Sequence, residues 1–424
     1  MKTIFRFSVL ALCACLTFTA CKKDKGGKDD EETKFSEKSI EQNKADIQQA
    51  GIDFTNELKS MQDSKAINAL LQLANLQQNG ELKDYVLKST DVESKLKGYD
   101  IPDELANTIS EFSGVYVWNA ETQTFDKTAA SKENTATYKF PYGIGSQSND
   151  CEINASVEYA SNVKNLPAKA TCELKINGTK CLGLSYVGTF TDEGYPTSIV
   201  ESFEIDDFAL TTNYTRNNSS FSVGVSFLHG TKTLLNTTTS VEGDLTDENI
   251  DKYVNATDEK TQSEFIYNVV SKLTFSTQVM NIKFVGSVST KALAELDTQE
   301  GEESEISSKE DLQKAVDEVN NAIDCYVANT SENTKIADIK LFVVKDDYED
   351  WEGNIVEDYD VEPKLVFADE SSMDFETYFK DGFKDLEKAI NDMEKSLEES
   401  LQKYGLISDD DDIIIDDEPT ELED

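Results

Sequence analysis

Residues 151–159 read Cys-Glu-Ile-Asn-Ala-Ser-Val-Glu-Tyr, and apolar and polar side chains alternate along the whole stretch. A period of two predicts a β-strand, because successive side chains of a strand point to opposite faces of a sheet. An antiparallel sheet that packs only one face on a core shows this pattern. The stretch therefore predicts an antiparallel sheet with one dry face and one wet face.

Turn signals next to this strand predict hairpins. Asn177-Gly178 is typical of a type I′ turn and joins residues 172–176 to a strand that begins at Thr179. Long strands joined in this way favour a strongly twisted, curved sheet, and an open half-barrel is one form that such a sheet takes. The other strands that we expect are 115–118, 124–125, 138–140, 199–214, 221–228 and 273–288, with a helical piece at about 248–270.

The chain before the sheet has helical spacing. From residue 35 to residue 78, apolar side chains recur every three to four residues, with interruptions at Lys44 and Gly51. Ser39 and Gln42 fit a capping box at the start of the first helix. This pattern predicts a helical hairpin whose apolar stripe packs on the core of the same chain, with a seam for a partner helix as the alternative. The further helices that we expect are a second one that ends near 79–80 and a third one that begins at Pro102.

A second structural unit is expected after the sheet. Residues 298–308 are acidic and poor in apolar side chains, which is typical of a linker. Ser307 and Glu310 then fit another capping box. The resulting α-β-β-α order predicts a small α+β subdomain. The expected elements are a helix through 312–326, strands 336–344 and 361–367, and a helix through 386–404 that ends at Gly405.

Together these patterns predict an α+β protein in which a helical hairpin packs on a long-stranded curved antiparallel sheet, followed by the small α-β-β-α subdomain. The expected order along the chain is a signal peptide at 1–20, a flexible tether at 21–34, a helical segment at 35–112, an antiparallel β domain at 113–297, an acidic linker at 298–308, an α+β subdomain at 309–405 and an acidic disordered tail at 406–424.

The chain is strongly acidic. It contains 83 Asp and Glu against 40 Lys and Arg, for a formal net charge of −43 at pH 7. Such a protein repels phosphate backbones, so the composition excludes general nucleic-acid binding. Hydrophobic residues still make up 38% of the chain, which is enough to build sizeable cores. We therefore expect a folded protein with other partners.

The N-terminus has the pattern of an export signal. Lys2 and Arg6 form a basic region, and the apolar stretch 7–19 is too short to span a bilayer. Small side chains at Thr19-Ala20 come directly before Cys21, which suits cleavage by a signal peptidase. The alternative is a soluble secreted protein in which Cys21 is incidental.

Residues 18–21, Phe-Thr-Ala-Cys, resemble a bacterial lipobox, and the Cys-Lys-Lys-Asp sequence from Cys21 onward is similar to the start of Bacteroidota lipoproteins. The resemblance implies that Cys21 becomes the lipidated first residue and anchors the protein in the outer membrane. It also implies that Asp24 or the acidic run 29–32 directs export to the cell surface, with the periplasmic face as the alternative location. Acyl chains on Cys21 would make the attachment stable without a spanning helix.

Four cysteines remain in the body of the chain. A two-residue turn at Asn177-Gly178 pairs Cys172 with residue 183, so Cys172 and Cys181 lie diagonally and their disulfide requires a bulge or a register shift. Cys151 is a rival partner, and buried free thiols, with Cys325 among them, are the alternative. The absence of a C-x-x-C motif excludes the usual redox and zinc motifs.

Catalytic motifs are largely missing. His229 is the only histidine, which excludes zinc sites built from two or three imidazoles of one chain. Because no G-x-S-x-G motif accompanies it, we interpret His229 as a turn residue. Gly143-Ile-Gly145 lacks the third glycine of a dinucleotide-binding loop and is interpreted as a loop. Paired carboxylates for glycan hydrolysis are recognised by their separation in space, so the sequence leaves this activity open.

One acidic cluster is a candidate calcium site, although its spacing differs from that of an EF-hand. A solvated hairpin turn is the alternative interpretation. The candidate ligands are Asp346, Asp347, Glu349, Asp350, Asp358 and Asp360, and Glu352 and Glu357 lie among them.

The sequence favours a lipid-anchored protein of the envelope that is not an enzyme and has a binding or structural role, with a protein or a glycan as partner. Trp118 and Trp351 are candidate sugar-stacking side chains. The second hypothesis is a carrier of an apolar ligand, because a curved sheet under helices resembles lipoprotein-carrier half-barrels in architecture. The third is a carboxylate-based glycan hydrolase. A continuous apolar cavity of several hundred Å³ would favour the carrier.

The anchoring hypothesis is tested by Cys21→Ser. We expect this variant to be lost from the membrane fraction of cells and recovered in the soluble fraction, because no thiol is left to carry the acyl chains. Fractionation and immunoblotting measure the distribution. Retention of the variant in the membrane at the wild-type level would contradict the hypothesis.

Overall fold

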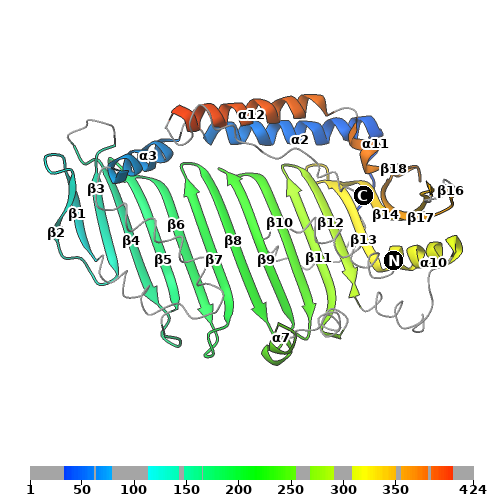
Figure 1. The fold of residues 1–424 in the computed structure, drawn as a ribbon, viewed down its shortest axis with the longest axis horizontal. Helices are drawn as coiled ribbons and strands as arrows, with labels where there is room; N and C mark the ends of the chain where they lie inside the picture. Colours follow the sequence, from blue (N-terminus) through cyan, green and yellow to red (C-terminus); the bar gives the residue numbers. More distant parts are fainter. Residues whose placement is uncertain are drawn as a thin grey trace.

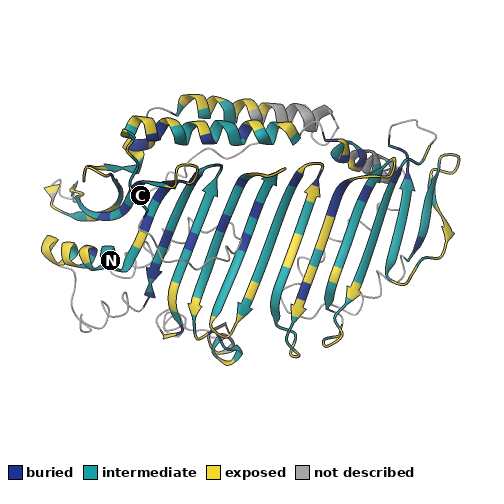
Figure 2. Cartoon of the chain, turned by 180° about the vertical axis from the view of Figure 1, so that it is seen from behind, coloured by how far each residue is buried: buried dark blue, intermediate teal, exposed yellow. Residues whose placement is uncertain are grey.

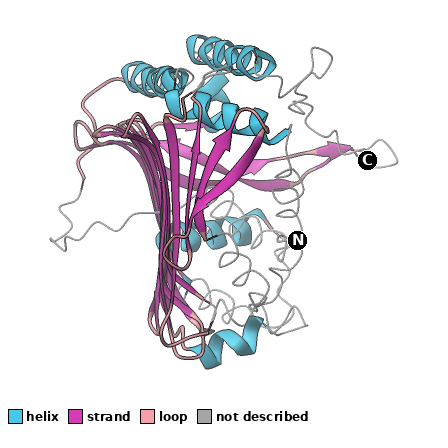
Figure 3. Cartoon of the chain, turned by 90° about the vertical axis from the view of Figure 1, so that its left-hand side faces the viewer, coloured by secondary structure: helices cyan, strands magenta, loops and turns pink. Residues whose placement is uncertain are grey.

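The computed structural model describes residues 33–61, 64–78, 113–142, 148–164, 166–254, 268–290, 308–349, 355–380 and 383–403. These residues form a long, curved sheet that does not close on itself, with helices on one side of it (Figures 1 and 3). The α+β class and the curvature of the sheet are thus as expected. We call the side on which helices α2 (Ile40–Ser60) and α3 (Lys65–Gln78) lie the inner face of the sheet and the opposite side the outer face.

Sixteen strands form the sheet in the order β18-β17-β14-β13-β12-β11-β10-β9-β8-β7-β6-β5-β4-β3-β1-β2. Neighbouring strands are antiparallel except β1 and β3, which are parallel, so the sheet is mixed rather than purely antiparallel. The bounds of the first twelve strands are β1 (Gly114–Asn119), β2 (Thr124–Ala129), β3 (Thr135–Phe140), β4 (Cys151–Tyr159), β5 (Pro167–Ile176), β6 (Thr179–Phe190), β7 (Pro196–Ile205), β8 (Phe208–Asn217), β9 (Ser220–His229), β10 (Lys232–Gly243), β11 (Val270–Val279) and β12 (Ile282–Ser289).

Two expected strands are hairpins in the structure. The stretch 199–214 covers most of β7, a tight turn at Asp206 and most of β8. The stretch 273–288 covers most of β11, a turn at Met280 and most of β12. Asp206 and Met280 adopt left-handed backbone conformations, with φ of 48° and 54°. Neither turn contains glycine or proline, so both lack the Asn-Gly or Asp-Gly pair that signals a two-residue hairpin most strongly. Strand β10 was not expected, because its Thr-rich sequence has little apolar alternation.

The strands that we expected in a separate subdomain continue the same sheet. Strand β13 (Ile323–Asn329) pairs with β12, and β14 (Thr334–Lys345), β17 (Tyr359–Val366) and β18 (Ser372–Asp374) follow it. Hydrogen bonding across the expected boundary at 298–308 overturns the prediction of an independent α-β-β-α unit. The linker itself lies outside the residues that the structure describes, apart from Ser308.

The helix that begins this part is shorter than expected. Helix α10 (Lys309–Ala322) ends before Ile323, because Ile323 and Tyr326 belong to β13. Ile323, Cys325 and Val327 alternate with more polar residues, and this period of two prevails over the helical spacing. The N-cap is Ser308, whose hydroxyl accepts a hydrogen bond from the Asp311 amide at 3.2 Å, in place of the expected Ser307.

The N-terminal helices begin as expected. Ser39 and Gln42 form the capping box of α2, with hydrogen bonds of 3.3 and 2.9 Å. The expected helical stripe packs on the core through Ile40, Ile47 and Phe54, which confirms the core interpretation. None of the described helices is both long and apolar enough to cross a bilayer. The other helices among the described residues are α7 (Asp247–Val254), α11 (Phe375–Lys380) and α12 (Lys384–Lys403). The helix expected at Pro102 lies outside the described residues.

Helices α2 and α3 do not form the expected hairpin. In Figure 1, α3 follows α2 along the same end of the strands, and the helix beside α2 is α12 from the other end of the chain. The two interruptions in the helical stripe have a structural reason. A Cβ atom at Gly51 would lie 2.7 Å from the Leu386 side chain of α12, and the buried Lys44 places its ammonium 5.1 Å from the Tyr378 ring centroid.

The main core lies between these helices and the inner face of the sheet, where Leu174, Leu182, Ile205 and Phe208 are buried on the consecutive strands β5–β8. Figure 2 colours the chain by burial. Cross-strand register places these four residues side by side. The helices cover one end of the strands, while the middle of the inner face extends beyond them (Figure 1). On β5–β8, burial is therefore highest in the row that lies nearest the helices.

We predict that Leu174→Ala lowers the free energy of unfolding by about 2–5 kcal/mol, because it removes a fully buried side chain and leaves a cavity. Thermal or urea unfolding followed by circular dichroism measures the change. Val187→Ala on the outer face, where Val187 is 45% exposed, is the matched control and should be nearly neutral. Equal effects of the two substitutions would contradict the placement of the core.

Candidate ligand-binding cavity

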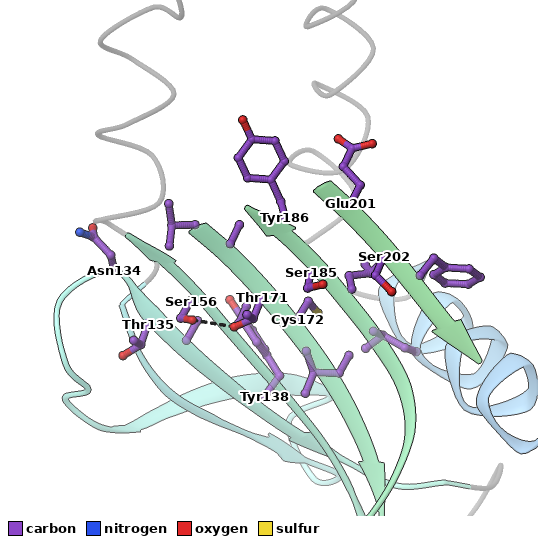
Figure 4. Close-up of a pocket in the computed structure, with 18 of the residues that line it drawn as sticks. Asn134, Thr135, Tyr138, Ser156, Thr171, Cys172, Ser185, Tyr186, Glu201 and Ser202 are labelled. Atoms are coloured by element: carbon purple, nitrogen blue, oxygen red, sulfur yellow. Dashed lines mark hydrogen bonds between the residues drawn. The ribbon is translucent and has the colours of Figure 1, made fainter. Parts of the chain in front are cut away.

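A cavity of about 820 Å³ lies on the inner face of strands β3–β8 and reaches Leu73 of α3 (Figure 4). The residues in one cross-strand row form its floor: Ala155 is paired with Cys172, Cys172 with Leu184, and Leu184 with Phe203, and Leu210 follows. The exposed surface of the lining is mainly apolar. Its volume lies within the range of binding pockets for small molecules.

The alternating sequences of these strands place apolar residues on the inner face beyond the described helices α2 and α3, and these residues form the cavity. Leu184 is 45% exposed although it points to the inner face of β6, between the buried Leu182 and the half-buried Tyr186. Exposing a large apolar side chain to water is unfavourable in free energy. The floor of the cavity is therefore a surface that an apolar molecule would stabilise by covering it.

An aromatic cluster bounds the cavity at the end of the sheet that contains β1. The Tyr116 and Tyr138 rings stack with centroids 4.8 Å apart, and Phe125 packs edge-on against Tyr138 at 5.5 Å. Trp118 packs on Phe125 at 5.2 Å and belongs to the core cluster, so this candidate sugar-stacking residue is engaged in packing. Burial raises the pKa of Tyr138 to about 12. This wall of the cavity is therefore lined by closely packed aromatic rings.

A small polar group interrupts the apolar lining. Tyr186 and Glu201 are cross-strand partners and lie side by side in Figure 4. Thr212 on the next strand donates a hydrogen bond from its hydroxyl to the Glu201 carboxylate at 3.0 Å. Burial, and then the Glu201 charge, raise the pKa of the Tyr186 phenol, which stays protonated at neutral pH.

The sequence analysis did not identify this group, although β7 contains a signal for it. The inner-facing positions of β7 are Ile199, Glu201, Phe203 and Ile205, so one carboxylate stands in an otherwise apolar phase. A strand that packs only on a core has no need of a charge at such a position. The phase of the strand had to be known before the charge could be recognised as unusual.

The four cysteines of the body are free thiols in the structure. A bulge in the β5–β6 hairpin pairs Cys172 with Leu184 rather than with residue 183, and Cys181 donates a hydrogen bond from its thiol to the Leu174 carbonyl at 3.4 Å. Cys172 lines the cavity, and burial raises its pKa. Burial raises the pKa of Cys151 to about 12. These thiols therefore act as small apolar side chains rather than as nucleophiles.

The candidate calcium residues are only partly described. They lie at a small hairpin formed by β15 (Tyr348–Glu349) and β16 (Ile355–Val356), while residues 350–354 and the Glu349 side chain are outside the description. Asp347 forms an ion pair with Lys345 at 2.7 Å. The Asp358 and Asp360 carboxylates each accept a hydrogen bond from the next backbone amide. Within the described part of the chain, no group of three or more metal-ligating side chains is found.

His229 joins helix α2 to the sheet. Its ring stacks on Phe208 with centroids 4.1 Å apart, and its Nδ1 lies 2.5 Å from Glu57 Oε2. Lys232 donates a hydrogen bond to Glu57 Oε1 at 2.7 Å. These two hydrogen bonds, with Lys232 as the larger cause, lower the pKa of Glu57 below its ordinary value of 4.5. The only histidine thus has a structural role beside the hairpin turn between β9 and β10.

Cys21, the signal peptide, Gly143-Ile-Gly145 and Trp351 lie outside the described residues, so the structure adds nothing to their interpretation. Comparisons of the chain with models of protein families, with curated proteins and with solved structures found no match. The functional argument therefore depends on the geometry of the cavity.

We predict that Glu57→Gln destabilises the protein by about 1 kcal/mol near pH 7. A carboxyl group whose pKa is lowered by folding stabilises the folded state above its unfolded pKa, near 4.5, and this contribution is lost as the pH falls through the lower folded pKa. The difference in melting temperature between wild type and variant should accordingly shrink below pH 4.5. A difference that does not change between pH 7 and pH 3 would contradict this assignment.

Proposed function

We propose that this protein is a lipid-anchored envelope protein that binds an apolar or amphiphilic small molecule in the cavity on the inner face of its sheet. The observation that supports the proposal is the apolar lining of a cavity of about 820 Å³. The carrier hypothesis requires such a cavity, whereas a purely structural protein does not. Attachment to the outer membrane, on the cell surface or on the periplasmic face, remains a proposal based on the lipobox-like sequence before Cys21.

Three features of the cavity support an apolar ligand. Its floor is a continuous row of apolar side chains, of which Leu184 is the most exposed. Tyr138 in its wall packs against the Tyr116 and Phe125 rings, which support its position. Preformed apolar pockets with a few polar groups are typical of small-molecule sites. Helix α3 lies at the edge of the cavity through Leu73, in the place that the carrier hypothesis gives to a lid.

The other two hypotheses have less support from the described residues. A carboxylate-based glycan hydrolase needs two facing carboxyl groups, and Glu201 is the one carboxylate among the described lining residues. A glycan-binding surface needs exposed aromatic rings, and the Trp118 ring is engaged with Phe125. Binding of a protein partner remains an alternative that the cavity does not require.

We predict that Leu184→Arg weakens ligand binding about tenfold or more, because it places a charged group on the apolar floor of the cavity. Titration of purified full-length protein with the fluorescent apolar probe N-phenyl-1-naphthylamine measures the affinity. Val187→Arg is a closely matched control: Val187 is on the same strand and equally exposed, at 45%, but it points to the outer face.

The control variant should bind the probe as wild type does. Failure of the wild-type protein to bind the probe, or equal losses for the two arginine variants, would overturn the proposal. Circular dichroism of each variant before the titration ensures that a lost affinity is not a lost fold.

A further inference from the structure

Glu201 has an unusual position in the sheet. Cross-strand register defines the inner-facing residues of strands β4–β9, and Glu201 is the one carboxylate among them. Its neighbours in the same row are Ala170, Tyr186, Thr212 and Val225. By contrast, Glu204 of the same strand points to the outer face. A single negative charge therefore stands on the wall of an apolar cavity.

No cation neutralises this charge among the described residues. The structure gives the Glu201 carboxylate one polar contact, the hydroxyl of Thr212 at 3.0 Å. Arg216 is the nearest inner-facing cation along the adjacent strand, but it forms an ion pair with Asp247 and lies over the Tyr195 ring, with its guanidinium carbon 5.8 Å from the ring centroid. Glu204 on the outer face has a cation, since Lys180 lies 2.7 Å from it. The two carboxylates of one strand thus differ in their pairing.

This difference restricts the ligand. A molecule that covers the cavity floor also removes water from Glu201, and a carboxylate that loses water without gaining a partner is costly. A purely apolar ligand does not offset this desolvation cost, and an anionic head group adds electrostatic repulsion with the Glu201 carboxylate. A head group with a positive charge and N–H donors compensates it through charge-assisted hydrogen bonds. The Tyr186 ring beside Glu201 offers a further favourable contact for a cation.

We propose that the ligand of the cavity is an amphiphile with a cationic amine head group. This inference depends on the proposed function and gives it a ligand class. The apolar part of the molecule lies along Cys172, Leu184 and Phe203, and the amine binds the Glu201 carboxylate between Tyr186 and Thr212. Figure 4 shows Glu201 beside Tyr186. The head group then lies at the next inner-facing row of residues along the strands, which contains Tyr186 and the exposed Glu201.

The proposal is tested by a head-group series of constant chain length. Dodecylamine, dodecanol and dodecanoate compete with N-phenyl-1-naphthylamine for the full-length protein at pH 7 and fixed ionic strength. The amine and the carboxylate are kept below their critical micelle concentrations, and the alcohol is kept below its solubility limit. We expect dodecylamine to displace the probe at a roughly fivefold lower concentration than dodecanol, and dodecanoate to be the weakest competitor. The factor is modest because Glu201 is exposed in the free protein.

Glu201→Gln removes the charge and keeps the shape of the side chain. We expect this variant to bind dodecylamine and dodecanol with equal affinity while its affinity for dodecanol stays close to the wild-type value. Glu204→Gln, on the outer face of the same strand, is the matched control and should keep the preference for the amine.

The outcomes separate this inference from the function on which it depends. Displacement by all three compounds without a preference for the amine, or a preference that persists in Glu201→Gln, would overturn the head-group assignment and leave the apolar site intact. Loss of the preference in Glu204→Gln would also overturn it, because the effect would then come from net charge. Absence of probe binding to the wild-type protein would overturn both proposals.

Discussion

The structure depends on the apolar inner face of one long sheet, which the described helices cover only in part. The inner face has rows of apolar side chains along the strands, while the described helices α2, α3 and α12 lie over one end of those strands. Where helices cover the sheet, residues such as Leu174 and Phe208 are fully or almost fully buried. Where they do not, the apolar phase continues into the cavity. Core and candidate site are thus two parts of the same surface, distinguished by what covers them.

Much of the sheet was predictable because alternation and turn chemistry are local properties. The strand at 151–159 and the hairpin at Asn177-Gly178 have the predicted positions, and the capping box at Ser39 fixes the start of α2. The turns at Asp206 and Met280 were missed because neither contains the glycine that marks the turn at Asn177-Gly178. Methionine in addition rarely adopts the left-handed conformation. The subdomain boundary was wrong because strand pairing such as β12 with β13 is set by long-range contacts that local patterns do not contain.

The candidate site was less predictable than the fold. The sequence suggested a carrier only through the expected curvature of the sheet, and it gave no position for a ligand. Residues that line a cavity have the same apolar pattern as residues of a core, and only the placement of the helices distinguishes Leu184 from Leu182. Glu201 became informative once the register showed that it faces inward. A lone charge in the apolar phase of a strand is a signal that sequence reasoning can use, provided that the phase is assigned correctly.

The contact between Gly51 and Leu386 brings together helices from the two ends of the chain, with almost the entire sheet between them in sequence. Closing so long a loop is slow and entropically costly, and it requires a complete polypeptide. During synthesis α2 therefore leaves the ribosome long before α12 has been made. A premature stop codon before Lys384 would remove no part of α2, yet it would deprive α2 of the helix that packs beside it.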